Sequence, residues 1–204
     1  MRGRSLAERS IAFGACCALG CLAAACASAP VNPVEAPKSA VVSELGRYLP
    51  LENDTVFSYE SYIEDTNEHG LVVFEIARPR PELAELSIAG QVRKRYYFEP
   101  GGVRSGQGGY LLKSPLSVNS EWTGDDGKVR VTSVAQSVDV PAGKFSGCIQ
   151  TVEQAQLASA TRTTTTVFCP GVGITTLQIE GEQDGTSVLQ RLQLKSFGPR
   201  FKGI

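Results

Sequence analysis

Histidine is almost absent from this sequence, and the shortage excludes sites that depend on several imidazoles. His69 is the single histidine of the chain, so a zinc site with two or three histidine ligands cannot form. A Ser-His-Asp triad would have to use the same residue, and no G-x-S-x-G motif accompanies it. His69 lies in the polar segment Asp65–Gly70, which predicts a solvated turn.

Acidic clusters of the kind that bind metal ions are also scarce. Asp125-Asp126-Gly127 resembles the start of a calcium loop, but the other oxygen ligands of such a loop are missing. The same three residues are typical of a tight hairpin turn. We therefore predict neither a metal nor a cofactor, and we predict that the protein is not an enzyme.

An excess of basic residues and a long apolar run are both missing from the body of the chain. The formal net charge is -1 at pH 7, whereas proteins that bind nucleic acid usually carry a basic excess. Beyond the N-terminal segment, no stretch approaches the roughly 20 apolar residues that a membrane-spanning helix needs. We expect no nucleic-acid partner and no spanning helix in the body.

Residues 1–25 have the layout of a secretion signal. Three arginines lie within Met1–Arg9, and the following segment Ser10–Ala25 carries no charge. A positive start before a short apolar core directs a chain to the export machinery. The core is rich in alanine, glycine and cysteine, so it is too short and too weakly apolar for a permanent anchor.

The end of this signal resembles a lipobox, in which small residues precede a cysteine that is lipidated and becomes the new N-terminus. The matching residues are Leu22-Ala23-Ala24-Ala25-Cys26, and Cys26 is the predicted lipidation site. Cys21 is an alternative with a shorter apolar core, and ordinary cleavage after Ala29 is another. The lipoprotein resemblance implies that Ala27 permits transfer to the outer membrane.

Residues 26–44 are predicted to form a tether between the lipid and the folded body. Pro30, Pro33 and Pro37 stop regular structure and favour an extended chain. The expected location is therefore a lipid anchor in the outer membrane, with the exported domain facing the periplasm or the cell surface. The expected partners are the membrane itself and an envelope protein, glycan or lipid.

Residues 45–198 are predicted to form one all-β domain, followed by a short tail at 199–204. Period-two alternation is broken by glycine, proline and Asp/Asn turns. The expected strands are Thr55–Glu64, Leu71–Ala77, Gln91–Glu99, a short strand near Val103, Trp122–Gly124, Lys128–Val140, Phe145–Gln156, Thr161–Cys169, Val172–Glu180 and Thr186–Phe197. Helix signals are confined to one or two turns in Ser39–Gly46. Sequential strands of this number favour a single antiparallel meander that forms a strongly curved sheet or barrel.

Cys148 and Cys169 lie in two successive predicted strands, and their spacing predicts a disulfide. If Ala158-Ser159 is the two-residue loop of that hairpin, the register places the two cysteines directly opposite each other. Opposed residues of a non-hydrogen-bonded pair lie about 4.5 Å apart in Cα, which a disulfide can span. Export to an oxidising compartment supports the bond. The alternative is two free, buried thiols.

Arg93-Lys94-Arg95-Tyr96-Tyr97 is the densest basic and aromatic cluster. In a regular strand Arg93 and Arg95 share one face, and Lys94 points to the other. One interpretation is a solvated edge strand, since charged residues protect exposed strand edges. The other is that Arg93 and Arg95 contact an anionic glycan or lipid head group.

Several short motifs resemble a family of exported bacterial β-domain proteins, many of them lipoproteins. Val140–Phe145 gives a V-P-A-G-x-F turn and Pro170–Gly173 a later P-G-V-G turn. The matching order continues through Tyr48–Leu51, Leu111–Leu116 and Trp122. The resemblance implies a curved antiparallel sheet and transfers no functional residue. Both turns also follow from proline fixing φ and glycine supplying positive φ, and Trp122 is expected to anchor the core or its rim.

Three functions are compatible with these observations. The first is a non-catalytic envelope lipoprotein that binds another protein or a glycan. The second is a carrier of a hydrophobic ligand, which requires an open apolar concavity inside the curved sheet. The third is a hydrolase that uses carboxylates alone, which requires two acids facing each other across a cleft.

Overall fold

The computed structural model describes residues 44–157, 160–183 and 186–201. The signal peptide, Cys26 and the proline-rich tether lie outside the described residues, so lipidation at Cys26 stays a prediction. In the described part of the chain, no helix is long and apolar enough to cross a membrane.

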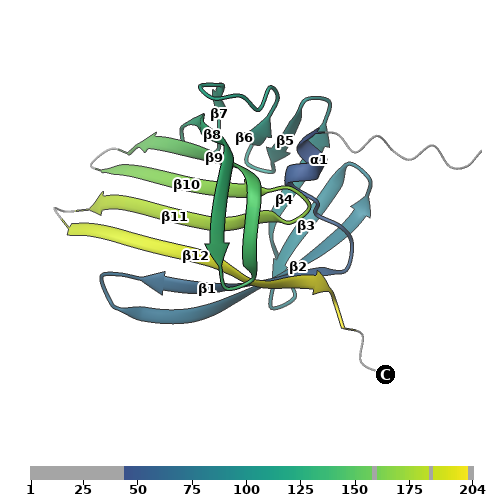
Figure 1. Ribbon diagram of the computed structural model, residues 1–204, viewed down its shortest axis with the longest axis horizontal. Helices are drawn as coiled ribbons and strands as arrows, with labels where there is room; N and C mark the ends of the chain where they lie inside the picture. The colour runs from purple at the N-terminus through teal and green to yellow at the C-terminus, as the bar shows by residue number, and fades with distance from the viewer. Residues whose placement is uncertain (1–43, 158–159, 184–185, 202–204) are drawn as a thin grey trace, which may run out of the picture. The chain divides into compact units, whose positions relative to one another are not determined.

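The described chain contains one short helix and twelve strands in a single antiparallel sheet. The elements are α1 (Glu44–Tyr48), β1 (Thr55–Ile63), β2 (Glu68–Arg80), β3 (Leu83–Ile88), β4 (Gln91–Glu99), β5 (Gly102–Ser105), β6 (Tyr110–Lys113), β7 (Glu121–Thr123), β8 (Lys128–Val140), β9 (Gly143–Gln156), β10 (Thr161–Cys169), β11 (Gly173–Gln183) and β12 (Thr186–Pro199). The spatial order is β6-β5-β4-β3-β2-β1-β12-β11-β10-β9-β8-β7 (Figure 1). The predicted all-β antiparallel meander is confirmed.

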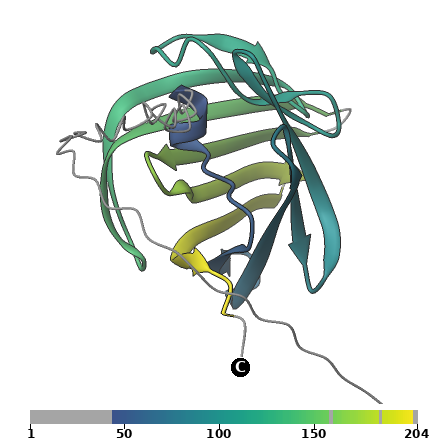
Figure 2. The ribbon, with the colours of Figure 1, turned by 90° about the vertical axis from the view of Figure 1, so that its right-hand side faces the viewer.

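The sheet curves into a nearly closed barrel, and its two edge strands, β6 and β7, come back toward each other (Figure 2). Side chains make the link. Trp122 Nε1 donates to the Tyr110 carbonyl at 2.9 Å. The Asp125 carboxylate accepts hydrogen bonds from the Gly109 N–H at 3.1 Å and from the Ser105 hydroxyl. We call this link the seam; it gives Trp122, 6% exposed, the anchoring role predicted for it.

Two strands, β3 and β6, were not predicted. β3 has the sequence LAELSI, with one β-branched residue, and β6 is only four residues long in a glycine-rich stretch. The second strand was also expected to end before Arg78, but β2 runs on to Arg80. A register shift between Ala77 and Arg80 leaves Pro79 outside the ladder with β3, so its missing N–H breaks no ladder bond.

The β9–β10 hairpin has the predicted register, with Thr161 opposite Gln156 and Phe168 opposite Ile149. The disulfide between Cys148 and Cys169 is present, and the two Cα atoms lie 4.2 Å apart. The observed register therefore places the two cysteines opposite each other, as predicted from a two-residue hairpin loop.

The glycines of the two turn motifs have the backbone conformation expected of them. Gly143 ends the turn between β8 and β9 with φ of 132°. Gly171, between β10 and β11, and Gly173, the first residue of β11, have φ of 75° and 100°. Side chains other than glycine rarely adopt these values, so each motif fixes a tight connection between neighbouring strands.

One part of the barrel is packed solid, and we call it the filled half. Helix α1 and the segment after it enter the concave side and bury Leu45, Leu49 and Leu51. The sheet contributes Leu112 and Phe168, both fully buried. The helix is about one turn long, and it ends at Tyr48, two residues beyond the predicted end at Gly46. Apolar packing, rather than helix propensity, sets its position.

Candidate functional site

The concave side of the sheet is not filled along its whole length, and the unfilled part is a cavity of about 420 Å³. We call this part the open half. Its volume is in the range of about 300–1,000 Å³ typical of small-molecule sites. Its apolar walls come from Tyr59, Phe74, Leu86, Ile88, Tyr96, Leu111, Ile174, Leu177, Ile179 and Leu192.

Strand register explains why these apolar side chains share one face. Ile76 lies opposite Leu86, and Leu86 lies opposite Lys94; directly opposed residues point to the same side of an antiparallel sheet. In β11 the register shifts, because Phe168 pairs with Ile174 and Val167 pairs with Thr176. That bulge adds one residue, so Ile174 and Leu177 face the cavity although three positions separate them.

The cavity walls are only partly buried, in contrast to the filled half. Phe74, Leu86, Ile174 and Leu192 each retain intermediate exposure, whereas Phe168 is fully buried. Apolar surface in contact with water is unfavourable, and covering it is favourable by about 25 cal/mol per Å². The open half therefore has a driving force for taking up an apolar ligand.

Polar and charged side chains border the same cavity. They are Arg93, Lys94, Asp125, Asp126, Glu153, Arg162, Thr164 and Thr166. The cavity consequently has an apolar wall and a charged border, so the two ends of a ligand would meet different chemistry.

The three acids of this border have partners within the fold. Glu153 Oε1 accepts hydrogen bonds from the N–H groups of Asp126 and Gly127, both at 2.9 Å. The Asp126 carboxylate pairs with Arg162 at 2.5 Å, and Asp125 belongs to the seam. The contacts of Glu153 and Arg162 hold the predicted Asp125–Gly127 hairpin turn against β9 and β10.

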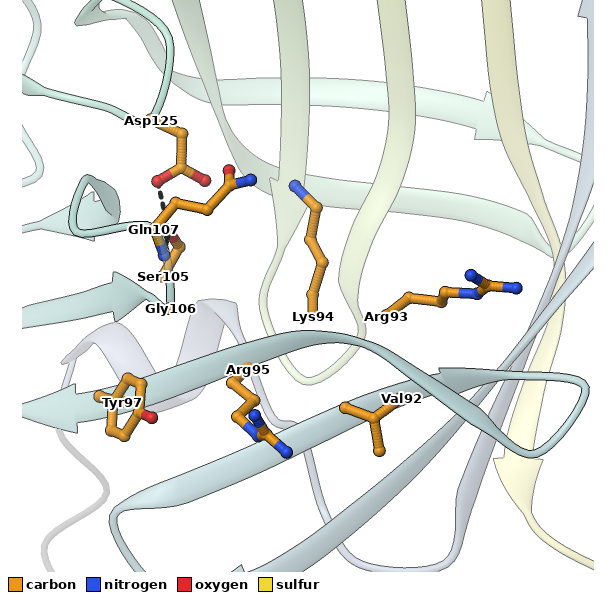
Figure 3. Close-up of a pocket in the computed structure, with 9 residues that line it drawn as sticks. All are labelled: Val92, Arg93, Lys94, Arg95, Tyr97, Ser105, Gly106, Gln107 and Asp125. Carbon is orange, nitrogen blue, oxygen red and sulfur yellow. Dashed lines mark hydrogen bonds between the residues drawn. The ribbon is translucent and has the colours of Figure 1, made fainter.

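The β3–β4 ladder has a bulge at Arg93, and it changes the predicted orientation of the basic cluster. Leu86 pairs with Lys94 and Ser87 pairs with Val92, so Arg93 is the extra residue. Figure 3 shows Arg93 and Lys94 on one side of the strand, with Val92 and Arg95 on the other. The prediction that Arg93 and Arg95 share a face is wrong, because a bulge interrupts the alternation on which it rested.

The side chains of Arg93 and Lys94 border the cavity, and both are exposed. Asp125 lies beside them at a smaller adjoining pocket of about 280 Å³. Arg95 borders only this smaller pocket, on the strand face that carries Glu85. Its Nε donates to the Glu85 carboxylate at 2.8 Å, and this hydrogen bond raises the pKa of the guanidinium.

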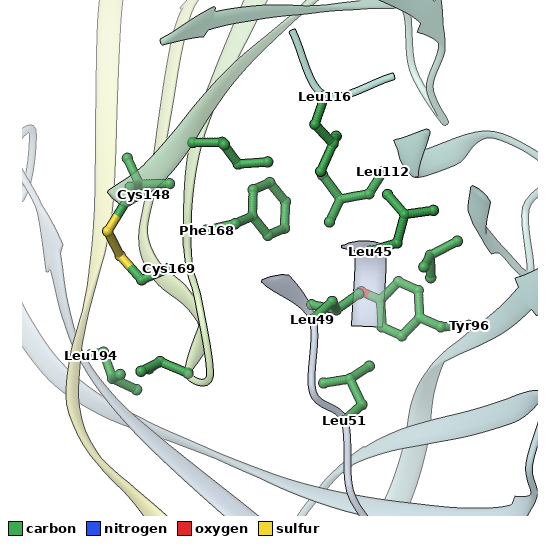
Figure 4. Packing of buried hydrophobic residues seen from close by; sticks show 14 of the residues in the cluster. Leu45, Leu49, Leu51, Tyr96, Leu112, Leu116, Cys148, Phe168, Cys169 and Leu194 are labelled. Atoms are coloured by element: carbon green, nitrogen blue, oxygen red, sulfur yellow. A yellow bond between two sulfur atoms is a disulfide. The ribbon is translucent and has the colours of Figure 1, made fainter. Parts of the chain in front are cut away.

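Two tyrosines lie where the cavity meets the filled half. Tyr59 and Tyr96 are 6% exposed, and burial raises the pKa of both phenols. The Tyr59 hydroxyl donates to the Ile174 carbonyl at 2.8 Å. Figure 4 shows Tyr96 beside Leu49 and Leu51. A further hollow of about 30 Å³ continues from the cavity between these residues.

Some residues of the cavity carried no clear signal in the sequence. Thr164 and Thr166 both border the cavity, and Thr166 is buried. Their positions share the parity of Phe168, a core residue of the same strand, and this was the available signal. His69 lies in β2 rather than in a turn; it is exposed, as expected, and its ring packs 4.8 Å from that of Tyr62.

Solved structures that are similar to this chain include two bacterial proteins. One is a Bacteroides fragilis protein described as exported with a YmcC-like fold, at a TM-score of 0.49 and 9% identity over 74% of this chain and 99% of that one. The other is a Parabacteroides distasonis protein described as a lipoprotein, at 0.44 and 10% over 74% and 98%. No family model and no curated protein match the chain. Similarities of this size carry no argument about function.

Proposed function

We propose that this chain is an exported lipoprotein, anchored to the outer membrane through Cys26, whose β-domain binds an apolar small molecule without converting it. The charged start and apolar core of residues 1–25 support export, and the lipobox resemblance supports the anchor. The cavity of about 420 Å³ with partly exposed apolar walls carries the binding proposal. It favours the ligand carrier over a module that binds proteins or glycans through its outer surface.

The non-catalytic part of the proposal is supported by the partners of the acids at the cavity. A carboxylate-based hydrolase needs one acid that can donate a proton and a second that can act as a base or nucleophile. Glu153 is bound by two backbone N–H groups, Asp126 is paired with Arg162, and Asp125 holds the seam. Each contact gives the acid a role in the fold.

The test begins with what the cavity contains after purification. The full mature chain carrying Cys26→Ser would be exported and purified without detergent, then examined by native mass spectrometry. We expect a co-purified small molecule, or an empty protein that takes up N-phenyl-1-naphthylamine, a neutral apolar fluorophore. A bare protein that leaves this probe unbound would contradict the proposal.

A matched pair of variants on β10 locates the binding. Thr164 borders the cavity, and its neighbour Thr165 points to the opposite side of the strand. Thr164→Trp should fill part of the cavity and weaken binding of the neutral probe about tenfold, because its volume displaces the ligand. Thr165→Trp should leave probe binding unchanged. Equal effects of both variants would place the probe elsewhere.

A further inference from the structure

Arg93 and Lys94 are two adjacent cations at the border of the cavity. Within the described residues, neither takes part in an ion pair or a side-chain hydrogen bond, and both are exposed. The bulge at Arg93 places the two on the same side of β4 (Figure 3). Two neighbouring positive charges repel each other, and an anion between them would relieve that repulsion.

The opposite charges around them are already bound. Asp126 pairs with the third cation of the border, Arg162, so this pair is neutral as a unit. Glu153 accepts two backbone N–H bonds. Asp125 faces the same opening, and its carboxylate accepts hydrogen bonds from the seam, so one engaged acid faces two unpaired cations. The local balance favours an anion at Arg93 and Lys94.

The far side of the cavity has the opposite character. Tyr59, Phe74 and Ile174 border both the cavity and the small hollow beyond it. That hollow is lined by Leu49 and Leu51 of the filled half. A ligand that reaches from the two cations to this floor passes from a charged environment to an apolar one.

We infer that the ligand is an anionic amphiphile whose carboxylate or phosphate head binds Arg93 and Lys94 and whose hydrocarbon chain lies in the apolar part of the cavity. The inference rests on the proposed function and names its ligand class. Charge-assisted hydrogen bonds from a guanidinium and an ammonium suit an oxyanion head. The partly exposed side chains of the wall suit a flexible apolar chain.

A series of ligands with one tail and different heads separates the inference from the proposed function. Dodecanoate, dodecyl phosphate, dodecanol and dodecyltrimethylammonium would compete with N-phenyl-1-naphthylamine for the full mature chain carrying Cys26→Ser, below their micelle concentrations. Binding of neutral dodecanol tests the cavity alone. We expect both anions to bind about tenfold more tightly than dodecanol, and the cation to bind more weakly. Tighter dodecanoate binding assigns a fatty-acid-like source, and tighter dodecyl phosphate binding assigns a phosphate-headed lipid.

Charge variants identify the residues that produce this preference. Arg93→Gln with Lys94→Gln should abolish the advantage of the anions over dodecanol. Arg95→Gln is the matched control, since Arg95 is paired with Glu85 on the opposite side of the same strand. Replacing both Arg93 and Lys94 by Glu should reverse the preference toward dodecyltrimethylammonium. All three positions are exposed, so the thermal midpoint of every variant should stay that of the parent.

Added salt gives an independent readout, because screening weakens an exposed charge contact and leaves apolar burial intact. Dodecanoate binding should weaken as salt rises from 0.01 to about 0.15 M, while dodecanol binding should not. The inference is overturned if dodecanol binds as tightly as the anions, or if Arg95→Gln lowers anion binding as much as the Arg93 and Lys94 variants. If no tail binds at all, the proposed function itself fails.

Discussion

The filled half and the open half are built from the same sheet, yet their interiors differ. In the filled half, α1 and the segment with Leu49 and Leu51 occupy the concave side and exclude water. In the open half nothing in the described chain does so, and Phe74 and Leu86 retain exposure. The difference shows that the chain fills one half with its own side chains and leaves the other available for a ligand.

The strongest test of this difference is the same Phe-to-Ala truncation in each half. Phe168→Ala removes a fully buried ring from the filled half and should lower the free energy of unfolding by about 3–5 kcal/mol. Phe74→Ala removes a partly exposed ring from the cavity wall and should cost less than half as much. Urea unfolding midpoints at constant slope measure both values.

The loss of ligand binding should be larger for Phe74→Ala than for Phe168→Ala, the reverse of the order expected for stability. Phe74→Ala removes a wall of the cavity, so the neutral probe should bind more weakly. Folded Phe168→Ala should bind it as the parent does. Equal losses of stability in the two variants would show that the halves do not differ in packing.

Removal of the disulfide is the next largest effect. The Cys148–Cys169 bond closes a loop with a sequence separation of 21, so Cys148→Ala with Cys169→Ala should lower the free energy of unfolding by about 3 kcal/mol through the entropy of the unfolded chain. Binding of the neutral probe to the folded variant should be unchanged, because neither cysteine borders the cavity. Unaltered urea midpoints would contradict the prediction.

The seam should give a smaller effect. Trp122→Phe removes the Nε1–H that the Tyr110 carbonyl accepts and should lower the free energy of unfolding by about 1–2 kcal/mol. It should also speed amide hydrogen exchange at Gly109, the backbone donor of the same link. Tyr48→Phe is the control, since its hydroxyl also donates to a carbonyl, that of Gly147, at an exposed site away from the seam. Equal exchange at Gly109 in both variants would show that Trp122 does not hold the seam.

The smallest expected effect is a loss of stability at alkaline pH, caused by the two tyrosines at the boundary between the halves. Burial raises the pKa of Tyr59 and Tyr96 above their ordinary value of 10.0. Each therefore contributes stability that is fully present below pH 10.0 and declines as pH rises above it. Tyr96→Phe should reduce the fall of the thermal midpoint between pH 9 and about 11 relative to the parent. Identical profiles for the variant and the parent would argue against a buried, neutral phenol at Tyr96.

Much of the fold followed from period-two alternation and turn chemistry. The long strands from β8 to β12 and the β9–β10 register were predicted within a few residues, because their hydrophobic pattern and turn residues agree. β3 was missed because LAELSI carries few strand-forming residues. β6 was missed because four residues are too few to show a period. Both owe their strand conformation to pairing with neighbours.

The cavity was harder to predict than the sheet, because a bulge leaves little mark on a sequence. The extra residue at Arg93 changes which side chains share a face of β4. Lys94, rather than Arg95, therefore borders the cavity together with Arg93. Threonine suits either face of a sheet, so within Thr163–Thr166 only the parity shared with Phe168 indicated which side chains point inward. The curvature of the whole sheet then turns that face into a cavity wall.

The pairing of β1 with β12 has a consequence for the connectivity of the domain. Thr55 lies opposite Pro199, so the sheet starts and finishes at neighbouring strands in its middle. Its two edges, β6 and β7, follow each other directly in sequence. A chain joined at β12 and β1 and cut between β6 and β7 would run through every strand in spatial order. The domain is thus a circular permutant of a plain twelve-stranded ribbon, and residues 115–118 are where the chain can be reopened without breaking a backbone hydrogen bond to a neighbouring strand.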